Sequence, residues 1–320
     1  MEYRLLGRTG VRVSSLCLGT MTFGGEADEA ESGRIFEACV EAGVNFVDTA
    51  DVYTEGRSEE IVGRLLAGRR DEFVLVSKVF GRKYAAPNSG GSSRRHIVRA
   101  VEASLKRLGT DRLDVSLLHQ FDDDVPLEET LGALDDLVRR GLVLYVGASN
   151  FAAWQYMKAL GISERSGLER LSVIQPMYNL VKRQAEVEIL PMARAERLGV
   201  MTFSPLGAGL LTGSYVAGGP RGRLAVNERY QRRYGLESYG ATAKRFVEYA
   251  QGAGMDPVTL AVAWCTSHPA VTAAIVGARS AAQVAPALAA GSFEMTPDMR
   301  EQITALSPEL PLAHDRREER

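Results

Sequence analysis

The 320-residue sequence predicts an α/β fold, a closed (β/α)8 barrel of the TIM type with an N-terminal β-hairpin and long loops at one face. Eight short, nearly continuous apolar runs alternate with longer amphipathic segments, and no shift in composition divides them. Short apolar runs are typical of parallel strands buried on both faces. Eight βα units in succession suit a barrel. We therefore predict a single domain that spans residues 1–320.

The opening segment YRLLGRTGVRVSSL precedes the first run and predicts a hairpin that turns between Gly7 and Gly10. Placed before the first strand, this hairpin would close the lower end of the barrel. The eight predicted strands that follow are SLCLG, VNFVD, FVLVSK, LDVSLLH, LVLYVGAS, LSVIQ, GVMTFSP and VTAAIVG.

Amphipathic helices are predicted between these strands. One begins near Ser92 and stops at Gly109, and another runs from Leu127 to Arg140 and ends at Gly141. One face of the first carries Ile97, Val101, Leu105 and Leu108.

Three segments are too long for ordinary connections: residues 79–95, residues 206–240 and the tail from Ser307. The first two follow the carboxyl ends of predicted strands. Barrel enzymes build their active sites at that face, so these two segments are expected to shape the active site.

Composition excludes several classes of protein. A formal net charge of −2 argues against a nucleic-acid-binding surface over the whole protein. Cys17, Cys39 and Cys265 are scattered and form no CxxC pair, so we expect reduced, mostly buried thiols in a cytoplasmic protein. No leader-like apolar segment opens the chain, and no run approaches the ~18 apolar residues of a membrane span.

Polar side chains stand at the ends of three consecutive predicted strands. The second strand ends at Asp48, with Tyr53 just beyond, the third ends at Lys78, and the fourth ends at His119. Because neighbouring strands of a barrel converge on one mouth, these four side chains should meet. A lysine beside a tyrosine favours the phenolate and lowers a pKa that is ordinarily about 10. The set predicts a proton donor with its tuning groups.

The sequence resembles the aldo-keto reductase family over nearly its whole length. NFVDTADVYTEGRSEE resembles the family signature around its Asp and Tyr, and Lys78 and His119 stand where the family's Lys and His belong. GLVLYVGASNF, SPLGAGLLTG and VGARSAAQ resemble further family blocks in the same order. The resemblance implies NAD(P)H-dependent reduction of aldehydes and ketones, or the reverse oxidation. It implies Tyr53 as general acid, tuned by Lys78 and Asp48, with His119 orienting the carbonyl.

The resemblance also implies a cradle for the nicotinamide. Ser149, Asn150 and Gln175 would hold its carboxamide, Phe203 would stack on its ring, and Tyr178 would form part of the wall. The residues expected along the inner mouth and near the pyrophosphate are Gly19, Thr20, Met21, Asp48, Ser204, Leu206, Gly207, Gly209 and Leu210.

The segment SPLGAGLLTG imitates a dinucleotide-binding glycine loop but lacks its context. It follows the seventh strand, and no strand ending in Asp or Glu lies about 20 residues on. We interpret it as a loop whose small residues let the backbone approach the pyrophosphate. A cluster of turn glycines is the alternative.

The segment after the last strand predicts a phosphate contact. Gly277 permits a sharp turn, Arg279 supplies a fixed cation, and Ser280 suits an N-cap. Free N–H groups at a helix start favour an anion, which indicates the 2′-phosphate of NADP(H), with NAD(H) possible. Gln283 matches the family's adenosine contact, whereas Ala287 stands where the family often has Asn, a departure that bears on adenine recognition.

Two alternatives compete with a reductase. In a metal-dependent barrel hydrolase, Asp48, Asp51 and His119 would be ligands, but Lys78 would repel the cation and no metal site is predicted. Potassium-channel β-subunits resemble this branch of the family, so the second alternative is a regulatory NADP(H)-binding subunit with little turnover.

The resemblance implies a small carbonyl compound as substrate, whose identity the sequence leaves open. Phe23, Tyr53 and Phe121 predict partly aromatic walls for its pocket. The oligomeric state stays open.

Overall fold

The structure, a computed structural model, describes residues 1–81, 86–215, 224, 227–311 and 313. Parallel strands form a closed barrel in the order β10-β3-β4-β5-β6-β7-β8-β9, and β1 (Tyr3–Leu5) pairs antiparallel with β2 (Arg12–Ser14). The predicted barrel and hairpin are confirmed. The barrel strands are β3 (Leu16–Gly19), β4 (Phe46–Asp48), β5 (Val74–Val79), β6 (Leu113–Leu118), β7 (Val143–Ser149), β8 (Leu171–Gln175), β9 (Gly199–Thr202) and β10 (Ala273–Val276).

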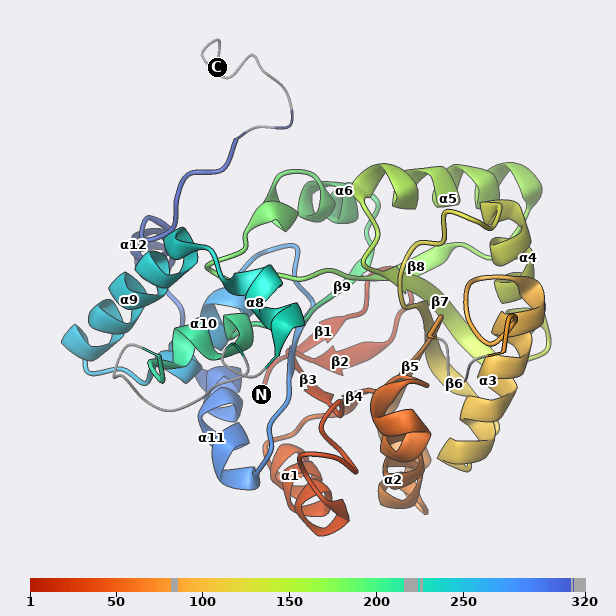
Figure 1. The fold of residues 1–320 in the computed structure, drawn as a ribbon, viewed down its shortest axis with the longest axis horizontal. Helices are drawn as coiled ribbons and strands as arrows, with labels where there is room; N and C mark the ends of the chain where they lie inside the picture. Colours follow the sequence, from red (N-terminus) through yellow and green to blue (C-terminus); the bar gives the residue numbers. More distant parts are fainter. Residues whose placement is uncertain (82–85, 216–223, 225–226, 312, 314–320) are drawn as a thin grey trace.

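Helices surround the strands as an outer ring, and one helix, α8 (Glu228–Tyr234), lies inside that ring in Figure 1. The ring helices are α1 (Glu29–Glu41), α2 (Arg57–Leu66), α3 (Arg94–Leu108), α4 (Leu127–Arg139), α5 (Ala153–Ser166), α6 (Ile189–Ala195), α9 (Glu237–Gly252), α10 (Pro257–Thr266), α11 (Ala281–Ala289) and α12 (Pro297–Thr304). Short 3-10 segments are η1 (Tyr53–Gly56), η2 (Arg70–Glu72), η3 (Gln184–Glu186), η4 (Gly207–Thr212) and η5 (Ala290–Ser292).

The two helices predicted from periodicity begin and end almost as expected. Ser93 caps α3 by accepting the N–H of His96, and Gly109 ends the helix at φ 62°. The second predicted helix, α4, starts at Leu127 and ends one residue early, with Arg140 as its C-cap. Left-handed backbone at a C-cap is cheapest for glycine, which is why Gly109 marks the end of α3.

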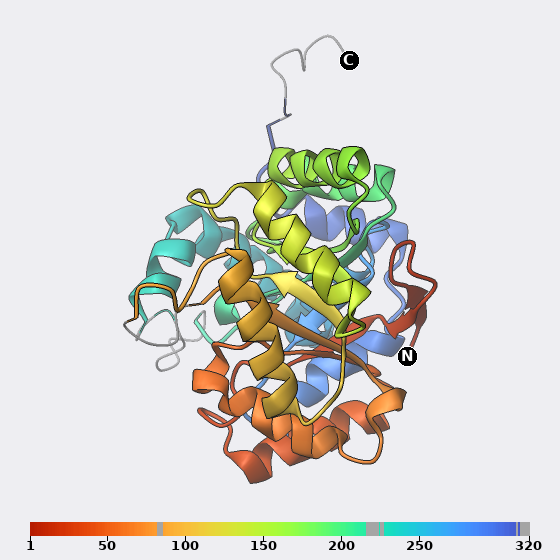
Figure 2. The same cartoon turned by 90° about the vertical axis from the view of Figure 1, so that its right-hand side faces the viewer.

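The hairpin closes the end of the barrel opposite α8, as Figures 1 and 2 together show. Leu6 and Val13 are fully buried in the cluster of side chains inside the barrel. Gly7 has φ +58°, and a Cβ there would lie 2.3 Å from the backbone nitrogen of Gly199, so only glycine fits. The predicted closure of the lower end is confirmed.

The segment after β9, expected as a loop over residues 206–240, contains η4, α8 and the start of α9 in its described part. η4 and α8, of six and seven residues, are too short to leave a clear hydrophobic period in the sequence. Residues 82–85 of the segment after β5, and residues 312 and 314–320 of the tail, lie outside the described part.

Two expectations from composition concern the cysteines and membrane-spanning helices. Cys17, Cys39 and Cys265 are free and buried, as predicted. Within the described part of the chain, no helix combines the length and the apolar character needed to cross a membrane.

Candidate active site

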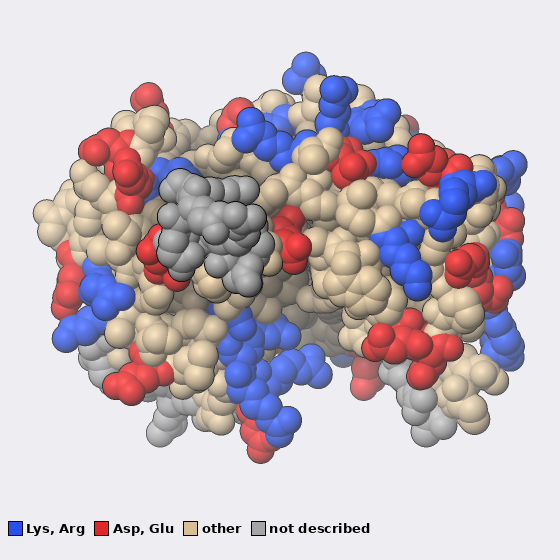
Figure 3. Space-filling view, turned by 90° about the horizontal axis from the view of Figure 1, so that it is seen from above, with Lys and Arg blue, Asp and Glu red and all other residues tan. Residues whose placement is uncertain are grey.

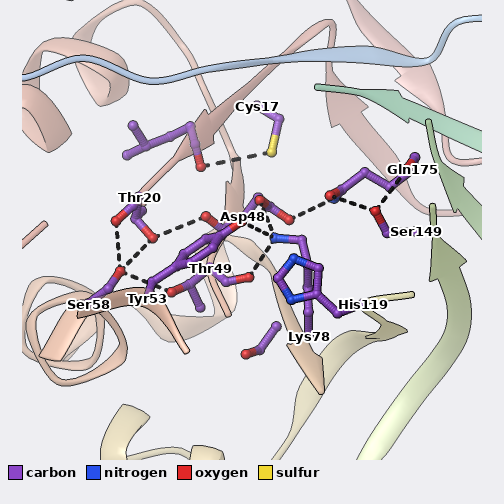
Figure 4. Close-up of polar contacts among 12 residues, drawn as sticks. Cys17, Thr20, Asp48, Thr49, Tyr53, Ser58, Lys78, His119, Ser149 and Gln175 are labelled. Carbon is purple, nitrogen blue, oxygen red and sulfur yellow. Dashed lines mark hydrogen bonds and ion pairs between the residues drawn. The ribbon is translucent and has the colours of Figure 1, made fainter. Parts of the chain in front are cut away.

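Four predicted side chains meet at the carboxyl ends of neighbouring strands. Asp48 is the last residue of β4, Lys78 lies near the end of β5, and His119 follows β6. Tyr53 begins η1, just beyond β4. Figure 4 shows them side by side, with the ammonium of Lys78 at the centre.

The ammonium of Lys78 is fully buried and uses all its donors. Its Nζ donates to Asp48 Oδ2 at 2.6 Å, to the carbonyl oxygen of Thr49 at 2.8 Å and to Tyr53 Oη at 3.0 Å. The same nitrogen lies 4.7 Å from the centroid of the Tyr53 ring. Because a buried cation must be paired and hydrogen-bonded, this arrangement fixes both the place of Lys78 and the direction of the Tyr53 hydroxyl.

A second hydrogen bond orients Asp48. Its Oδ1 accepts from Gln175 Nε2 at 2.9 Å, so both carboxylate oxygens have donors. Burial raises the pKa of Asp48, and Lys78 and Gln175 oppose this. Burial alone would lower the pKa of Lys78, but Asp48 and Tyr53 outweigh it and raise that pKa above its ordinary value. The two donors on its carboxylate oxygens make Asp48 a fitting anionic partner for the Lys78 cation.

Tyr53 differs from the sequence-based prediction in its acidity. Its pKa is raised above the ordinary value, because burial is the largest influence and Lys78 offsets only part of it. The expected net lowering of the pKa is therefore wrong for the protein without bound ligand. At neutral pH Tyr53 keeps its proton.

His119 is held as a neutral imidazole. Burial, followed by the nearby charge of Lys78, lowers the pKa of His119 to about 3. Its ring meets the Tyr53 ring edge-on, with centroids 6.1 Å apart and planes at 80°. A neutral imidazole can donate one N–H to an oxygen beside the Tyr53 hydroxyl.

A left-handed turn directly after Tyr53 sets the direction of its side chain. Thr54 and Glu55 have φ of 47° and 58°, and Gly56 has φ of 95°. Such conformations are costly for residues other than glycine and persist only where neighbours enforce them. The Thr54 hydroxyl donates to the carbonyl oxygen of Phe23 at 2.9 Å, which helps to hold the turn.

A buried carboxylate that the sequence analysis missed braces this turn against β5. Glu59, in the first turn of α2, is fully buried. It accepts from Ser77 Oγ at 2.6 Å and from Arg107 Nη2 at 2.6 Å. Since Ser77 precedes Lys78, Glu59 links α2, α3 and the strand that carries the lysine. The apolar neighbours of Glu59 at helical spacing gave no sign of this role.

A cluster of hydroxyl groups supports Asp48 from the other side. Thr20 Oγ1 donates to the carbonyl oxygen of Asp48 at 3.1 Å and lies 2.9 Å from Ser58 Oγ. Ser58 Oγ also lies 3.1 Å from Thr49 Oγ1. Thr20 is fully buried, so it braces the strand ends instead of facing the mouth, whereas Met21 is 42% exposed at the rim.

The residues expected around the carboxamide adjoin the four catalytic candidates. Ser149 Oγ donates to the carbonyl oxygen of Gln175 at 2.9 Å. Asn150 has φ of 56° and donates through Nδ2 to the carbonyl oxygen of His119 at 2.9 Å. Phe203, directly after β9, is half-buried. The sequence analysis placed these residues near the four candidates, but it did not predict that Gln175 also donates a hydrogen bond to Asp48.

The loop after β9 has the backbone of a tight turn that approaches other groups closely. Ser204, Gly207 and Gly209 have φ of 58°, 56° and 94°, and Leu210 is buried. Leu206 is half-buried, and a Cβ on Gly207 would lie 3.1 Å from the side chain of Val181.

The segment after β10 begins a helix, as predicted, but several of its N–H groups are already hydrogen-bonded within the protein. Ser280 caps α11 by accepting the N–H of Gln283. The N–H of Arg279 donates to Gln283 Oε1, and the N–H of Ala281 donates to Glu31 Oε1 at 2.7 Å. Any phosphate recognition here would depend on the Arg279 guanidinium, which is 49% exposed and 3.7 Å from Glu26. At the strand end itself, a Cβ on Gly277 would lie 2.9 Å from the carbonyl oxygen of Gly19.

Two aromatic assignments are wrong. Tyr178 does not line the mouth, because its ring is fully buried and stacks on Trp264 of α10 with centroids 5.0 Å apart. Phe23 is also fully buried in the core. Phe121 is half-buried and packs edge-on against Phe151.

Within the described part of the chain, no group of three or more His, Cys, Asp or Glu side chains could hold a metal ion. Asp48, a ligand in the hydrolase alternative, has its carboxylate oxygens bonded to Lys78 and Gln175. Asp51 is buried, and its N–H donates to the carbonyl oxygen of Lys78 at 3.1 Å.

Comparison with known proteins identifies the family. Residues 15–308 match the model of the aldo/keto reductase family. The chain belongs to this family. It is an NAD(P)H-dependent aldo-keto reductase by class, and members of the class act on small carbonyl compounds.

Three relatives cover nearly the whole aldo-keto reductase chain. A probable voltage-gated potassium channel subunit beta from Oryza sativa is 37% identical over 97% of this chain and 98% of its own. The oxidoreductase YrpG of Bacillus subtilis is 36% identical over 96% of each chain. Versiconal hemiacetal acetate reductase of Aspergillus parasiticus is 32% identical over 93% of this chain and 94% of its own.

Proposed function

We propose that this aldo-keto reductase reduces aldehydes or ketones to alcohols with NADP(H) and that Tyr53 is the general acid. The observation that carries the proposal is the 3.0 Å contact of Lys78 Nζ with Tyr53 Oη, in a buried site where Asp48 neutralises the lysine. A cation in that place is unchanged by the reaction and stabilises the phenolate that forms when Tyr53 gives up its proton.

The side chains divide the proton-transfer work. A bound nicotinamide supplies the hydride that the carbonyl carbon accepts. Tyr53 gives its phenolic proton to the carbonyl oxygen, and Lys78 stabilises the phenolate left behind. His119, neutral because its pKa is lowered to about 3, donates an N–H that positions the same oxygen.

The residues present suit a nicotinamide dinucleotide. The hydroxyl of Ser149 and the amides of Asn150 and Gln175 lie beside the catalytic candidates and can bind a carboxamide. The left-handed loop from Ser204 onward presents backbone that can approach a pyrophosphate. Arg279 supplies a cation for the 2′-phosphate, and this charge is our reason for preferring NADPH over NADH.

A panel of aldehydes and ketones, followed through the nicotinamide absorbance with NADPH and NADH in parallel, tests the function. We expect turnover with at least one carbonyl class and faster turnover with NADPH. Absence of turnover across the panel, with cofactor bound, would contradict the enzymatic proposal.

A second candidate, a regulatory NADP(H)-binding subunit, is favoured by the relatives. Those from Oryza sativa, Arabidopsis thaliana and Schizosaccharomyces pombe are all named as voltage-gated potassium channel beta subunits, probable or putative. The same panel separates the two candidates, because a regulatory subunit would bind the cofactor tightly and turn over barely. A cytoplasmic location stays a prediction from the cysteines.

A further inference from the structure

The side chain of Lys182 reaches the backbone of Arg233, a residue of α8, and both residues carry a positive charge. Lys182 lies in the segment after β8, and its Nζ donates to the carbonyl oxygen of Arg233 at 3.3 Å. The same nitrogen lies 5.7 Å from the ring centroid of Tyr234 and 5.6 Å from that of Tyr239. The guanidinium of Arg233 lies 5.8 Å from the ring of Tyr230. Aromatic rings thus frame both charges.

Neither cation has an acidic partner in the described part of the chain. On the same helix, by contrast, Arg232 pairs with Glu228 at 3.4 Å. Lys182 is only half-exposed, and burial together with the charge of Arg233 lowers its pKa. Holding two like charges together without an anion is unfavourable, so a bound anion would relieve this repulsion.

The pair lies next to the catalytic site because α8 is anchored over the strand ends. Tyr234 is buried, and its hydroxyl accepts from Asn179 Nδ2 at 3.1 Å. The same amide donates to the carbonyl oxygen of Ser204 at 2.9 Å, in the loop expected to hold the cofactor. On the adjacent part of α8, Tyr230 is near enough to Tyr53 to influence its pKa.

The surface near α8 is positively charged. Lys and Arg side chains gather at the centre of the lower edge in Figure 3, where Figure 1 places α8. An open hollow of about 520 Å³ lies along α8. It is lined by Glu228, Arg229, Arg232 and Arg233, and Lys182 is not among its lining residues. A cationic rim of this kind attracts anions toward the site from a distance.

We propose that Lys182 and Arg233 form a subsite for an anionic group of the substrate, so that the preferred substrates are aldehydes or ketones that also carry a carboxylate or a phosphate. The reacting carbonyl would lie at Tyr53, and the anionic end would lie between the two cations. This inference rests on the proposed function and names the substrate class for it.

Matched substrate pairs test the subsite. Succinic semialdehyde is compared with butanal, and glycolaldehyde phosphate with glycolaldehyde, for the wild type and for Lys182→Met and Arg233→Gln. The methionine keeps an apolar stem between the tyrosine rings. A charge-assisted hydrogen bond contributes roughly 1.5–3 kcal/mol, so kcat/KM for each anionic substrate should fall about tenfold to a hundredfold. For the neutral partners it should stay within about twofold.

Controls separate this role from the alternatives. Arg140→Gln, at the end of α4, paired with Glu102 and 47% exposed, should leave the ratio of anionic to neutral substrates unchanged. An equal loss for neutral and anionic substrates would show a merely structural role. Weaker binding of NADPH in the two variants, measured by fluorescence titration, would assign the cations to the cofactor's phosphates. Either result overturns the inference.

Binding without turnover keeps the inference independent of the enzymatic proposal. If no carbonyl is reduced by the wild type, the proposed function fails, and calorimetry on the NADP-bound protein still compares γ-hydroxybutyrate with butanol. The subsite predicts tighter binding of the carboxylate, lost in Lys182→Met. Equal affinity for both alcohols would exclude it.

Discussion

The phenol of Tyr53 can act as an acid only with help, because burial makes its phenolate unfavourable. Lys78 gives that help through a contact that exists before any ligand arrives. Asp48 and the carbonyl oxygen of Thr49 orient the lysine when the protein folds, and Gln175 in turn orients Asp48. Preorganisation of this kind is a large contribution to catalysis in buried sites.

Tyr53→Phe should abolish most carbonyl reduction while the fold and cofactor binding persist. Removal of a general acid typically costs about 10²- to 10⁴-fold in rate, and the ring that packs beside His119 is retained. Single-turnover kinetics with NADPH in excess measure the change. Tyr249→Phe, which loses a surface hydroxyl bonded to Gln302, should behave as the wild type. Near-normal turnover by the Tyr53 variant would show that another group supplies the proton.

Lys78→Met should move the alkaline limb of the pH–rate profile to higher pH and slow reduction at neutral pH. Lys78 opposes the rise in the pKa of Tyr53 that burial causes, so its removal raises that pKa further. A weaker acid transfers its proton more slowly. Lys106→Met, on the exposed face of α3, is the control. A profile that coincides with the wild type would contradict the role of Lys78.

The sequence allowed these four side chains to be placed together, because Asp48, Lys78 and His119 each close an apolar run and Tyr53 follows the first of these runs. It did not allow the partners of these side chains to be predicted. Gln175 meets Asp48 across the barrel, and Glu59 meets Ser77 between α2 and β5. These pairings depend on the tilt and register of strands that are far apart in the chain, which local patterns do not encode.

At the scale of single elements, α11 shows how a helix start can be satisfied without a ligand. Glu31 of α1 accepts the N–H of Ala281, and the side chain of Gln283 accepts that of Arg279. An exposed guanidinium is thus the group at this helix start that remains suited to a phosphate. Sequence identified the N-cap Ser280 correctly, but not the carboxylate from α1 that reaches it.

Arg279→Ala should weaken NADPH binding about tenfold to a hundredfold, as the loss of a charge-assisted hydrogen bond predicts. NADH, which lacks the 2′-phosphate, should bind almost as before. Fluorescence titration of both cofactors measures this. Arg140→Ala is a matched control, since Arg140 is 47% exposed and paired with Glu102 at the end of α4. Equal losses for both cofactors, or none, would remove the phosphate role.

η1 and α2 hold Tyr53 in place against the ends of the strands. η1 carries the tyrosine on a left-handed turn, and α2 follows immediately with Ser58 and Glu59 turned inward. One hydroxyl and one carboxylate thereby tie the helix to the ends of β3, β4 and β5. The chain places a candidate catalytic residue and its bracing residues within one short segment, which is why its sequence pattern is so distinctive.

At the scale of the whole molecule, the residues that close the core and those of the candidate active site lie at opposite ends of the barrel. The hairpin closes one end of the barrel (Figures 1 and 2), and the candidate active site lies at the carboxyl ends of the strands, at the other end. Leu6→Ala should therefore lower the free energy of unfolding by about 2–5 kcal/mol, the usual cost of a large cavity in a core.

Chemical denaturation measures this loss, and NADPH affinity measured below the transition should be unchanged. Leu5→Ala is the control, because its side chain is 50% exposed next to the fully buried Leu6. If the Leu6 variant were as stable as the Leu5 variant, the hairpin would not contribute to the core as its burial indicates.

The fold as a whole was predictable because the eight strands and their helices repeat one pattern. The corrections concern places where that pattern stops. Tyr178 lies beyond the end of β8, where strand alternation no longer tells which side a residue faces, and it turns toward Trp264. Helix α8 is too short to show a period, although it lies over the mouth.

Barrel closure has a consequence for how the protein is made. β10 joins the two ends of the sheet, pairing with β3 on one side and β9 on the other. While the ribosome is still working upstream of Ala273, both of those strands carry unpaired backbone edges, which are templates for association with other chains. A product that ended before Ala273 would contain Tyr53 and the three side chains proposed to assist it, yet its sheet would stay open between β3 and β9. Closure of the scaffold therefore waits for a strand of four residues near the end of the chain.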